Sequence, residues 1–420
     1  MQPGDRAFLT GLFEAAVAAA DPVAALRPHM PARPAGRLVV IGAGKGAAQL
    51  ARAFENLWSG PVEGVVVTRY GYGAQCRHIR VLEAAHPVPD AAGLAASAAL
   101  LDAVSGLGPD DLVVALICGG GSSLLPSPPE GLTLDDERAL NVALLASGAP
   151  IGVMNAIRKH VSDIKGGRLA VAAHPARVLT LVVSDVPGDD PAEVASGPTV
   201  PSPVTLDETM AMIRNRGIVL PPAILRHLVQ AGEAPRPTDS VFDGHETRVI
   251  ASARLSLEAA AARAEAAGVH AVILSDAIEG EAREVGLVHA ALAREVARRD
   301  QPFARPVVLL SGGETTVTLR NPAGRGGRNT EFLLAFAAAV DGVDGIAALA
   351  ADTDGIDGSE DNAGAFADGS SAARMRAAGA DPMAALQAND AWGAFDAVGD
   401  IFAPGPTGTN VNDFRAILLR

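Results

Sequence analysis

The sequence predicts an α/β protein of two domains, each built on a mainly parallel sheet flanked by helices. The chain has 420 residues, about the length of two domains. Apolar residues make up 49% of it and charged residues 20%, which is enough to bury substantial cores and excludes disorder. Short apolar runs alternate with helical stretches, and this alternation is typical of βα units.

The expected elements follow in order along the chain. An N-terminal helix carries Phe8, Leu12 and Phe13 on one face, so it is expected to pack on the body of the protein. Strands are expected at 37–41, 64–68, 111–117, 178–183, 248–250, 270–274, 306–310 and 346–349, with helices between them, for example at 256–267 and 281–299. The segment 198–246 is proline-rich and has few strand signals. It predicts a boundary near residue 245, with domains at 1–245 and 246–420.

Charge and composition exclude several classes of function. The net charge of −14 does not suit a nucleic-acid binder, although local positive clusters can still bind small anions. No apolar run is long enough to cross a membrane, and the first residues lack the basic segment of a secretory signal. Two cysteines, Cys76 and Cys118, exclude a disulfide framework and a thiolate zinc site. We expect a cytoplasmic monomer or homodimer with small-molecule partners and neither nucleic acid nor membrane.

Lysine is rare in this chain. Of 34 basic residues only Lys45, Lys159 and Lys165 are lysines, and all three lie beside glycines or in a dense polar cluster. Either this is chance in an arginine-rich protein, or these positions need a compact ammonium group that arginine cannot replace.

A glycine loop, Gly42-Ala43-Gly44-Lys45-Gly46-Ala47, follows the first expected strand and opens a helix. Small residues there let backbone N–H groups approach an anion. The dinucleotide fingerprint needs an acid at the end of the next strand, but that strand ends in Thr68-Arg69. A Walker A loop fails as well, because Gly46 follows the lysine. A tight turn is the alternative, but a turn needs no ammonium group.

A second glycine loop, Gly119-Gly120-Gly121-Ser122-Ser123, follows a buried strand. Its N–H groups and hydroxyls suit a phosphate or a carboxylate. It is not the nucleophile elbow of a hydrolase, because Leu124 stands where that motif has glycine. A flexible turn is the alternative.

Two polar segments follow. In the first, Asn155, Arg158, Ser162 and Lys165 have helical spacing and are expected to line one face, either as a binding surface or as a solvated face. His160, in the same segment, is equally compatible with a core position and with a catalytic base. In the second, Asp185 and Asp189 follow the fourth strand and suit Mg²⁺ held partly through waters, or serve as ordinary turn acids.

The second half of the chain repeats this chemistry. The motif Ser311-Gly312-Gly313-Glu314 follows an expected strand, and Arg325 and Arg328 stand in a glycine-rich setting that favours an anion clamp. The run from Asp352 to Gly358 is not an EF-hand, because Ile356 and Asp357 occupy positions that need an acid and a glycine. Anion-binding glycines, basic groups and carboxylates without a strong nucleophile–base pair favour phosphoryl transfer.

In this ordered set the sequence resembles the glycerate 2-kinases whose C-terminal part is called the MOFRL domain. The matching motifs are GAGKGA (42–47), CGGGSSLLPSP (118–128), RKHVSDIKGGRLA (158–170), SDVPGDDPAEVASGPT (184–199), SGGETTVTL (311–319), GRGGRNTEF (324–332), AADTDGIDG (350–358) and PTGTNVND (406–413). The resemblance implies two α/β domains with an active site in the cleft between them. It also implies phosphorylation of D-glycerate to 2-phosphoglycerate by ATP and Mg²⁺. Lys45 and Arg325 match functional positions of the family, and Arg328 is close by.

The kinase hypothesis assigns a role to each candidate residue. Catalysis is expected from Lys45, Asp185 and Arg325, and Mg²⁺ is expected to bind Asp185 and Asp189. The glycerate carboxylate is expected to bind Arg158, Lys159 or Arg328. ATP is expected to lie against Gly42, Gly44, Gly119, Gly120, Gly121, Ser122, Ser123, Gly312, Gly313 and Glu314. Family members are also called hydroxypyruvate reductases. An NAD(P)H-dependent reductase, in which Arg69 accepts a 2′-phosphate, is therefore the main alternative. A non-catalytic sensor of sugar acids or nucleotides is a third possibility.

Overall fold

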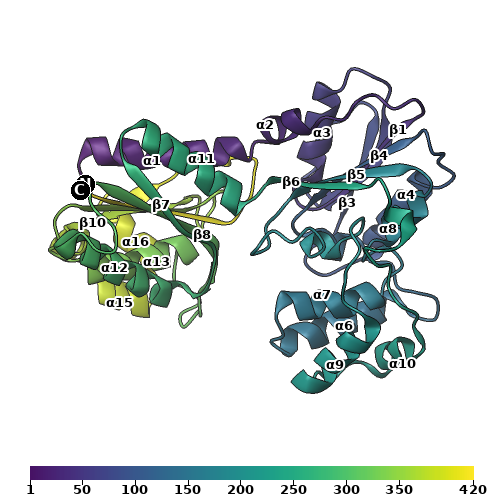
Figure 1. Ribbon diagram of the computed structural model, residues 1–420. Coiled ribbons are helices and arrows are strands. Elements are labelled where there is room, and N and C mark those ends of the chain that lie inside the picture. Colours follow the sequence, from purple (N-terminus) through teal and green to yellow (C-terminus); the bar gives the residue numbers. More distant parts are fainter. The chain divides into compact units, whose positions relative to one another are not determined.

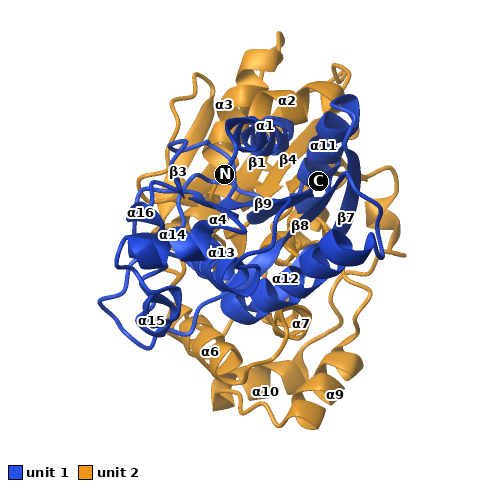
Figure 2. Cartoon of the chain, turned by 90° about the vertical axis from the view of Figure 1, so that its left-hand side faces the viewer, with its two compact units in different colours: residues 1–21, 251–420 blue, residues 22–250 orange.

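The computed structural model describes residues 1–420, which form two compact units. Unit 1 contains Met1–Asp21 and Ala251–Arg420, and unit 2 contains Pro22–Ile250 (Figure 2). The second boundary lies close to the expected residue 245. The first 21 residues, expected in the N-terminal domain, instead complete unit 1.

Unit 2 is built on a six-stranded sheet in the order β3-β2-β1-β4-β5-β6 (Figure 1). The strands are β1 (Leu38–Ala43), β2 (Glu63–Arg69), β3 (Ile79–Ala84), β4 (Leu112–Cys118), β5 (Arg177–Val183) and β6 (Glu246–Ala251). The pairs from β3 through β5 are parallel, as predicted. All residues of β1 and β4 are buried, which explains their unbroken apolar runs. The prediction missed β3, in which only the end residues Ile79 and Ala84 are buried, while Arg80 and Glu83 are exposed.

Helices cover this sheet on both faces, with α3 on one side and α4 and α8 on the other (Figure 1). The helices of unit 2 are α2 (Pro22–Leu26), α3 (Ala47–Leu57), α4 (Ala91–Ala103), α5 (Gly121–Leu124), α6 (Leu134–Ala146), α7 (Ile151–His160), α8 (Arg168–Ala173), α9 (Leu206–Arg216) and α10 (Pro222–Gln230), with 3₁₀ turns at Arg27–His29, Val194–Ser196 and Ser240–Phe242. The strand order reverses between β1 and β4. In open parallel sheets, ligands bind at the carboxyl ends of the strands that flank such a reversal.

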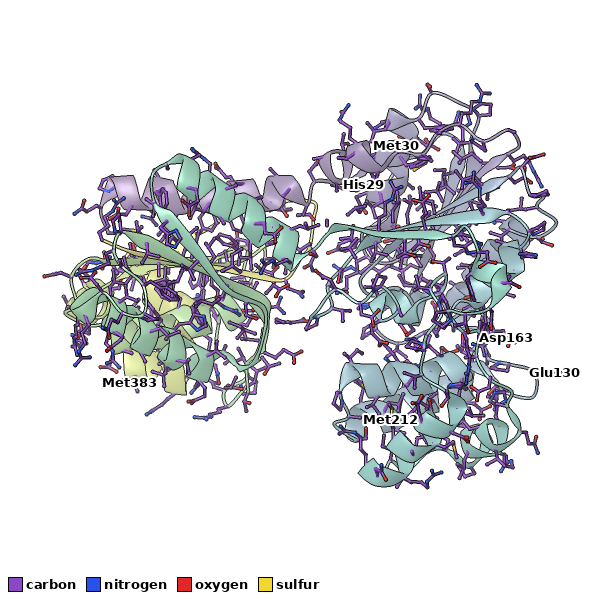
Figure 3. The ribbon with its side chains drawn as sticks, in the orientation of Figure 1. His29, Met30, Glu130, Asp163, Met212 and Met383 are labelled. Carbon is purple, nitrogen blue, oxygen red and sulfur yellow. The ribbon has the colours of Figure 1, made fainter.

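Helices α6, α7, α9 and α10 form a separate cluster with its own apolar core, which includes Leu140, Leu144, Ile157 and Leu228. The connections that carry Glu130 and Asp163 lie beside this cluster (Figure 3) and are joined where Asp163 N donates to Ser127 O at 2.8 Å. The proline-rich segment supplies α9 and α10. It is therefore part of the body of unit 2 and not a junction between domains, because its apolar residues pack against α6 and α7.

Unit 1 has a six-stranded sheet in the order β11-β10-β9-β12-β8-β7. Its strands are β7 (His270–Glu281), β8 (Val307–Thr316), β9 (Ile346–Asp352), β10 (Gly364–Asp368), β11 (Ile401–Phe402) and β12 (Asp413–Leu419), and its helices are α1 (Pro3–Ala19), α11 (Ala253–Ala266), α12 (Ala282–Arg299), α13 (Arg328–Ala339), α14 (Ser371–Ala377), α15 (Pro382–Gln387) and α16 (Ala391–Asp396). Helices α1 and α11 pack on one face of the sheet, and α12 and α13 pack on the other (Figure 1).

The sheet of unit 1 corrects the prediction of a second mainly parallel sheet. Only β7 and β8 are parallel; the other four pairs are antiparallel. The last strand, β12, inserts between β8 and β9 and runs against both. The connection from β9 to β10 contains no helix, and parallel neighbours need a long crossover.

The N-terminal helix α1 buries Leu9, Leu12 and Phe13 in the core of unit 1. The Phe13 ring packs edge-on against Phe402 and Phe414, with ring centroids 5.1 and 5.8 Å away. The expected packing of this helix is therefore correct. No single helix is long and apolar enough to cross a membrane; α1 and the helical stretch after it reach that length only as a pair bent by 51°.

Candidate active site

The first glycine loop lies at the strand-order reversal of unit 2. Lys45 follows β1, and its backbone N–H donates to Gly119 O at 2.9 Å, which joins the loops after β1 and β4. Thr68 Oγ1 at the end of β2 donates to Lys45 O at 3.0 Å. Gly44 has φ +134°, and a β-carbon there would stand 2.3 Å from Cys118 O. Glycine is therefore required for the two strand ends to approach this closely.

The Lys45 ammonium group is half-buried and forms no ion pair within the chain. Its side chain faces Gly120, which has φ +76°. A β-carbon on Gly120 would lie 3.0 Å from Lys45 Cε and also 3.0 Å from His86 Nε2. Lys45 Cε and His86 Nε2 are therefore separated by no more than twice 3.0 Å. The loops after β1, β3 and β4 converge on one point.

The other two lysines are structural. Lys159 Nζ donates to Glu193 Oε1 and Lys165 Nζ donates to Glu137 Oε1, each at 2.7 Å, and both lysines are buried. The predicted substrate role of Lys159 finds no support, because its ammonium group is already neutralised and closed off from solvent. Helix α7 ends at His160, so the expected single face from Asn155 to Lys165 does not exist.

Arg158 belongs to an internal hydrogen-bond network. Its Nε donates to Asn141 Oδ1 at 2.9 Å and its Nη1 to Asn155 Oδ1 at 3.0 Å. Asn155 Oδ1 also accepts from Ser196 Oγ at 3.0 Å, and Ser196 Oγ lies 2.8 Å from Ser122 Oγ. This network links α7 to the second glycine loop, so Arg158 supports the loop through Asn155.

Asp185 lies against that loop from the side of β5. Its Oδ2 atom is 1.8 Å from the point where a β-carbon on Gly119 would stand, so residue 119 must be glycine for the carboxylate to occupy this position. Asp189, half-buried, has φ +54°. No three His, Cys, Asp or Glu side chains in the chain are grouped to hold a metal ion. A magnesium ion takes one or two carboxylates together with waters and phosphate oxygens, and the Asp185 carboxylate meets that smaller requirement.

In unit 1, the motif with Gly312, Gly313 and Glu314 was predicted to follow a strand as a loop. That prediction is wrong. These residues lie inside β8, where Gly312 and Gly313 pair with β12 and Glu314 pairs with β7. Gly313 has φ +124°, and a β-carbon there would stand 2.2 Å from Ile278 O on β7. The glycine is explained by this close backbone approach, and no ATP-binding role is needed to account for it.

Arg328, the first residue of α13, forms the centre of a charged cluster with three acids. It donates to Asp413 Oδ1 at 2.5 Å, to Asp352 Oδ2 at 2.7 Å and to Glu314 Oε1 at 3.1 Å. Burial lowers its pKa, but the three carboxylates more than offset this and hold the pKa above its ordinary value. Burial raises the pKa of Asp352, and the positive charge of Arg328 opposes that shift. Arg328 thus carries its charge under all ordinary conditions.

The cluster rests on buried supports. Asp413 also pairs with Arg415, which is completely buried, and accepts from Asn329 Nδ2 at 2.9 Å. Asp357 caps α13 by accepting from the backbone N–H groups of Asn329 and Thr330, at 2.9 and 2.8 Å. Asp357, in the run from Asp352 to Gly358, thus has a capping role.

Arg325 lies in the exposed loop before α13. Its guanidinium stands 4.3 Å from the centroid of the Trp392 ring, and its Nε is 3.6 Å from Asp390 Oδ1. Its side chain is 48% exposed. Arg325 and Arg328 therefore do not form one clamp: Arg328 is fixed by carboxylates, whereas Arg325 is held by a ring and remains open to solvent.

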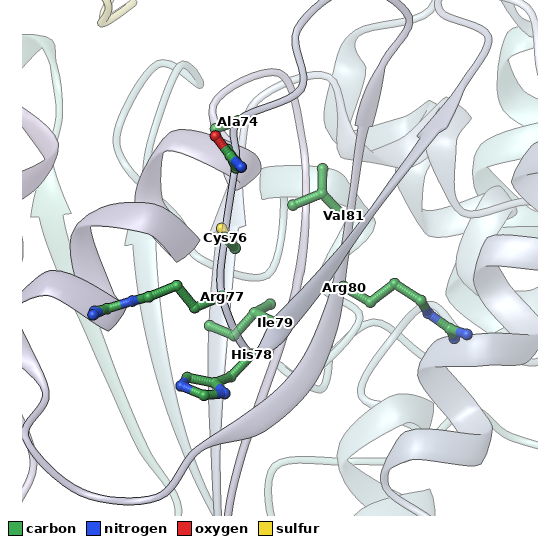
Figure 4. Close-up of a pocket in the computed structure, with 8 residues that line it drawn as sticks. Ala74, Cys76, Arg77, His78, Ile79, Arg80 and Val81 are labelled. Carbon is green, nitrogen blue, oxygen red and sulfur yellow. The ribbon is translucent and has the colours of Figure 1, made fainter.

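A separate hollow of about 430 Å³ lies along residues 74–81, before and within β3 (Figure 4). Buried Glu55 of α3 shapes this segment by accepting from the N–H groups of Arg77, His78 and Ile79, each at 2.7 Å. None of the predicted site residues lines the hollow.

Sequence reasoning missed His86 and undervalued Arg69. Arg69 ends β2, and its Cα pairs with that of Ala84, two residues before His86. Recognising β3 was the necessary step, because the end of that strand places His86 beside Lys45. The mixed apolar and polar sequence Ile79-Arg80-Val81-Leu82-Glu83-Ala84 carries that signal weakly.

Comparison with known proteins gives a consistent result. Residues 8–229 match the domain of unknown function DUF4147, and residues 307–413 match the MOFRL family. A Thermotoga maritima protein named D-glycerate 2-kinase is 37% identical over 94% of this chain and 94% of its own. The crystal structure of a Thermotoga maritima glycerate kinase covers 100% of both chains with a TM-score of 0.91 at 34% identity.

The chain belongs to the glycerate kinase family with a C-terminal MOFRL domain. An Agrobacterium vitis relative is 54% identical over 99% of this chain and 94% of its own, and its name assigns it provisionally as a hydroxypyruvate reductase. Relatives within one family thus carry two kinds of name.

Within this glycerate kinase family member, the two matched segments separate the candidate residues. The DUF4147 segment holds Lys45, the loop after β4 and Asp185. The MOFRL segment begins with β8 and ends at Asp413, so it encloses the whole cluster around Arg328.

Proposed function

We propose that this protein is an ATP-dependent D-glycerate 2-kinase. It transfers the γ-phosphoryl group of ATP to the 2-hydroxyl group of D-glycerate. The proposal is supported by the names of the relatives and by the chemistry of the loops in unit 2. It also accounts for the absence of a nucleophile–base pair, because phosphoryl transfer depends mainly on positioning and charge neutralisation.

The observation that carries the proposal is the position of Lys45. Of the three lysines, it alone lacks a carboxylate partner, and it lies where the strand order reverses, facing Gly120. A half-buried ammonium group beside the backbone N–H groups of a glycine loop suits the negative charge of a transferring phosphoryl group. We assign this role to Lys45, with the phosphates of ATP along Gly119–Ser123.

Magnesium would be held by Asp185, with Asp189 nearby, and would neutralise charge on the phosphate oxygens of ATP. The role of the chain itself is to hold the Asp185 carboxylate against Gly119. In unit 1 we assign an anion-stabilising role to Arg328, whose charge and orientation are held by three carboxylates. Arg325, exposed and stacked on Trp392, is assigned to contacts made when substrates bind.

A hydroxypyruvate reductase is the second candidate, because the order β3-β2-β1-β4-β5 is also that of dinucleotide-binding sheets. This is an analogy of fold. The strand that should end in a ribose-binding acid ends in Arg69, which stacks on Tyr72 at 3.5 Å from the ring centroid. The chemistry of this sheet edge therefore favours the kinase.

The test is a ³¹P NMR time course of the purified protein with ATP, Mg²⁺ and D-glycerate, with a Lys45→Met variant as control. A new monoester signal from 2-phosphoglycerate, absent in the variant, is the expected result. A 3-phosphoglycerate signal would keep the kinase and correct the position of transfer. Unchanged ATP, together with oxidation of NADPH by hydroxypyruvate, would favour the reductase.

A further inference from the structure

Two groups beside Lys45 are left without a role by the proposed function. They are Arg69, at the end of β2, and His86, after β3. The register between these strands places Arg69 opposite Ala84, and Tyr70 N donates to Ala84 O at 3.1 Å. Both side chains therefore lie at the same sheet edge as the glycine loops.

Arg69 has an unsatisfied buried atom. Its Nε is buried without a hydrogen-bond partner, and it forms no ion pair with a carboxylate of the chain. The Tyr72 ring, 3.5 Å from the guanidinium carbon, holds one face of the group in place. Buried polar groups of proteins are almost always hydrogen-bonded, so the chain leaves part of the hydrogen-bonding capacity of this guanidinium group unused.

His86 presents an uncharged nitrogen to the same space. Its Nε2 and Lys45 Cε are each 3.0 Å from the point where a β-carbon on Gly120 would stand. Burial, and then the positive charges of Lys45 and Arg69, lower the pKa of His86 to about 4. The ring is therefore neutral near pH 7 and has one nitrogen that accepts a hydrogen bond.

The nearby acids are already engaged. Asp90 caps α4, accepting from Gly93 N at 2.9 Å, and also accepts from Tyr70 Oη at 2.7 Å. Glu83 accepts from Gly73 N at 2.9 Å. Neither Lys45 nor Arg69 forms an ion pair with Asp90 or Glu83, so the edge formed by Lys45, Arg69 and His86 suits an anionic ligand.

We propose that Arg69 and His86 form the subsite for the hydroxy acid substrate, with Arg69 binding the carboxylate and His86 accepting a hydrogen bond from the adjacent hydroxyl group. This assignment rests on the proposed kinase function and deepens it. The planar fork of an arginine matches a carboxylate better than a lysine does. An unprotonated imidazole nitrogen suits a hydroxyl donor, whereas a fully ionised phosphate has no proton to donate. Lys45 is left to the phosphoryl group.

The first experiment is steady-state kinetics on Arg69→Met, Arg69→Lys and His86→Gln, with Arg80→Met on β3 as the matched control. Arg69→Met is expected to raise KM for D-glycerate by about 100-fold, the loss of a charged hydrogen-bonding partner, and to leave KM for ATP within about twofold. Arg69→Lys should recover part of this loss. His86→Gln should raise the same KM by about 10-fold, and Arg80→Met should change neither.

Glycerol, which lacks the carboxylate, separates recognition from a general loss of activity. The wild type should prefer D-glycerate to glycerol strongly, and Arg69→Met should remove most of that preference by losing activity on D-glycerate alone. Equal losses on both acceptors, or a rise in KM for ATP alone, would overturn the subsite. Melting temperatures of the variants within a few degrees of the wild type would exclude misfolding. Tyr72→Leu is a second variant, which removes the ring that holds Arg69 in place and leaves the charge of Arg69 intact.

Calorimetric binding of D-glycerate, in the presence of ADP and Mg²⁺, distinguishes failure of the subsite from failure of the kinase. Binding that Arg69→Met weakens, without turnover by the wild type, would keep the subsite and reject the kinase. Turnover by the wild type with unchanged binding in Arg69→Met would keep the kinase and reject the subsite. Binding of NADPH that depends on Arg69 would assign the residue to a 2′-phosphate and overturn the proposal.

Discussion

Arg328 Nε donates to Asp413 Oδ1 at 2.5 Å, although the two residues are 85 positions apart. Asp413 is the first residue of β12, and Arg328 is the first residue of α13. The contact exists because β12 pairs with β8, which precedes α13 in the chain. The same carboxylate compensates Arg415, whose side chain is completely buried. Asp413 therefore both orients a candidate catalytic arginine and neutralises a structural one.

Replacing Asp413 by Asn should destabilise the protein by about 3–5 kcal/mol, because the buried charge of Arg415 would lose its partner. The matched control is Glu314→Gln, which removes another carboxylate from Arg328 at a side chain 52% exposed. That change should cost less than about 1 kcal/mol. Urea unfolding of both variants measures the difference, and equal losses would show that the burial of Arg415 does not dominate.

The three lysines should separate into two classes. Lys45→Met should lower kcat by about 100-fold or more, the scale for losing one preorganised donor, with little change in stability, because Lys45 has no ion pair to lose. Lys159→Met should destabilise by about 3–5 kcal/mol, because it leaves Glu193 unpaired near a buried site.

Kinetics at a temperature well below the unfolding transition, combined with urea unfolding, tests this separation. If Lys159→Met remained stable and lost only its affinity for glycerate, the predicted substrate role of Lys159 would be restored. If Lys45→Met unfolded as readily as Lys159→Met, Lys45 would have to be a structural residue too.

Gly120→Ala should lower kcat/KM by about 100-fold. The added methyl group would stand 3.0 Å from both Lys45 Cε and His86 Nε2, so it would displace two groups that the proposed function needs. Gly131→Ala is the control, because Gly131 has a comparable φ of +85° with nothing within 4 Å of its β-carbon position. Both variants should lose about 1–2 kcal/mol of stability from the left-handed backbone. A similar fall in activity for the two variants would mean that backbone strain alone explains the effect.

Much of unit 2 could be predicted from the sequence, because β1 and β4 are buried throughout and read as unbroken apolar runs. The apolar runs at β1 and β4 placed Lys45 and Gly119 after the ends of strands, and the structure shows that these strands are neighbours. Chain order alone could not reveal the partners of Lys159 and Lys165, since Glu193 and Glu137 are 34 and 28 residues away. A lysine in a polar segment looks the same whether it faces a ligand or a buried carboxylate.

Unit 1 was harder to predict for a topological reason. Gly312 and Gly313 suggested a loop, yet they lie within β8, where Gly313 allows the backbone of Ile278 to approach. The antiparallel insertion of β12 depends on pairing between residues about a hundred positions apart, for example Phe414 with Gly312. Such pairing leaves no local pattern in the sequence.

A buried histidine should make the stability of unit 1 depend on acid pH. His289 on α12 is 3% exposed; its Nδ1 lies 2.8 Å from Val285 O and its Nε2 lies 3.0 Å from Ser311 Oγ. This arrangement fits a neutral ring that donates from Nδ1 and accepts at Nε2. Burial, and then the positive charge of Arg415, lower its pKa from 6.5 to about 4.

Between pH 6.5 and about 4 the unfolded state therefore binds a proton that the folded state does not, and stability falls as the pH falls through this range. The loss should reach about 3 kcal/mol by pH 4. His289→Gln cannot take up this proton. Between pH 6.5 and pH 4 the free energy of unfolding should therefore fall by about 3 kcal/mol more in the wild type than in the variant. Urea unfolding at several pH values gives both curves, and His270→Gln, at a ring that is mostly exposed, should follow the wild type. Parallel curves for the wild type and His289→Gln would mean that the folded protein accepts the proton at His289 without cost.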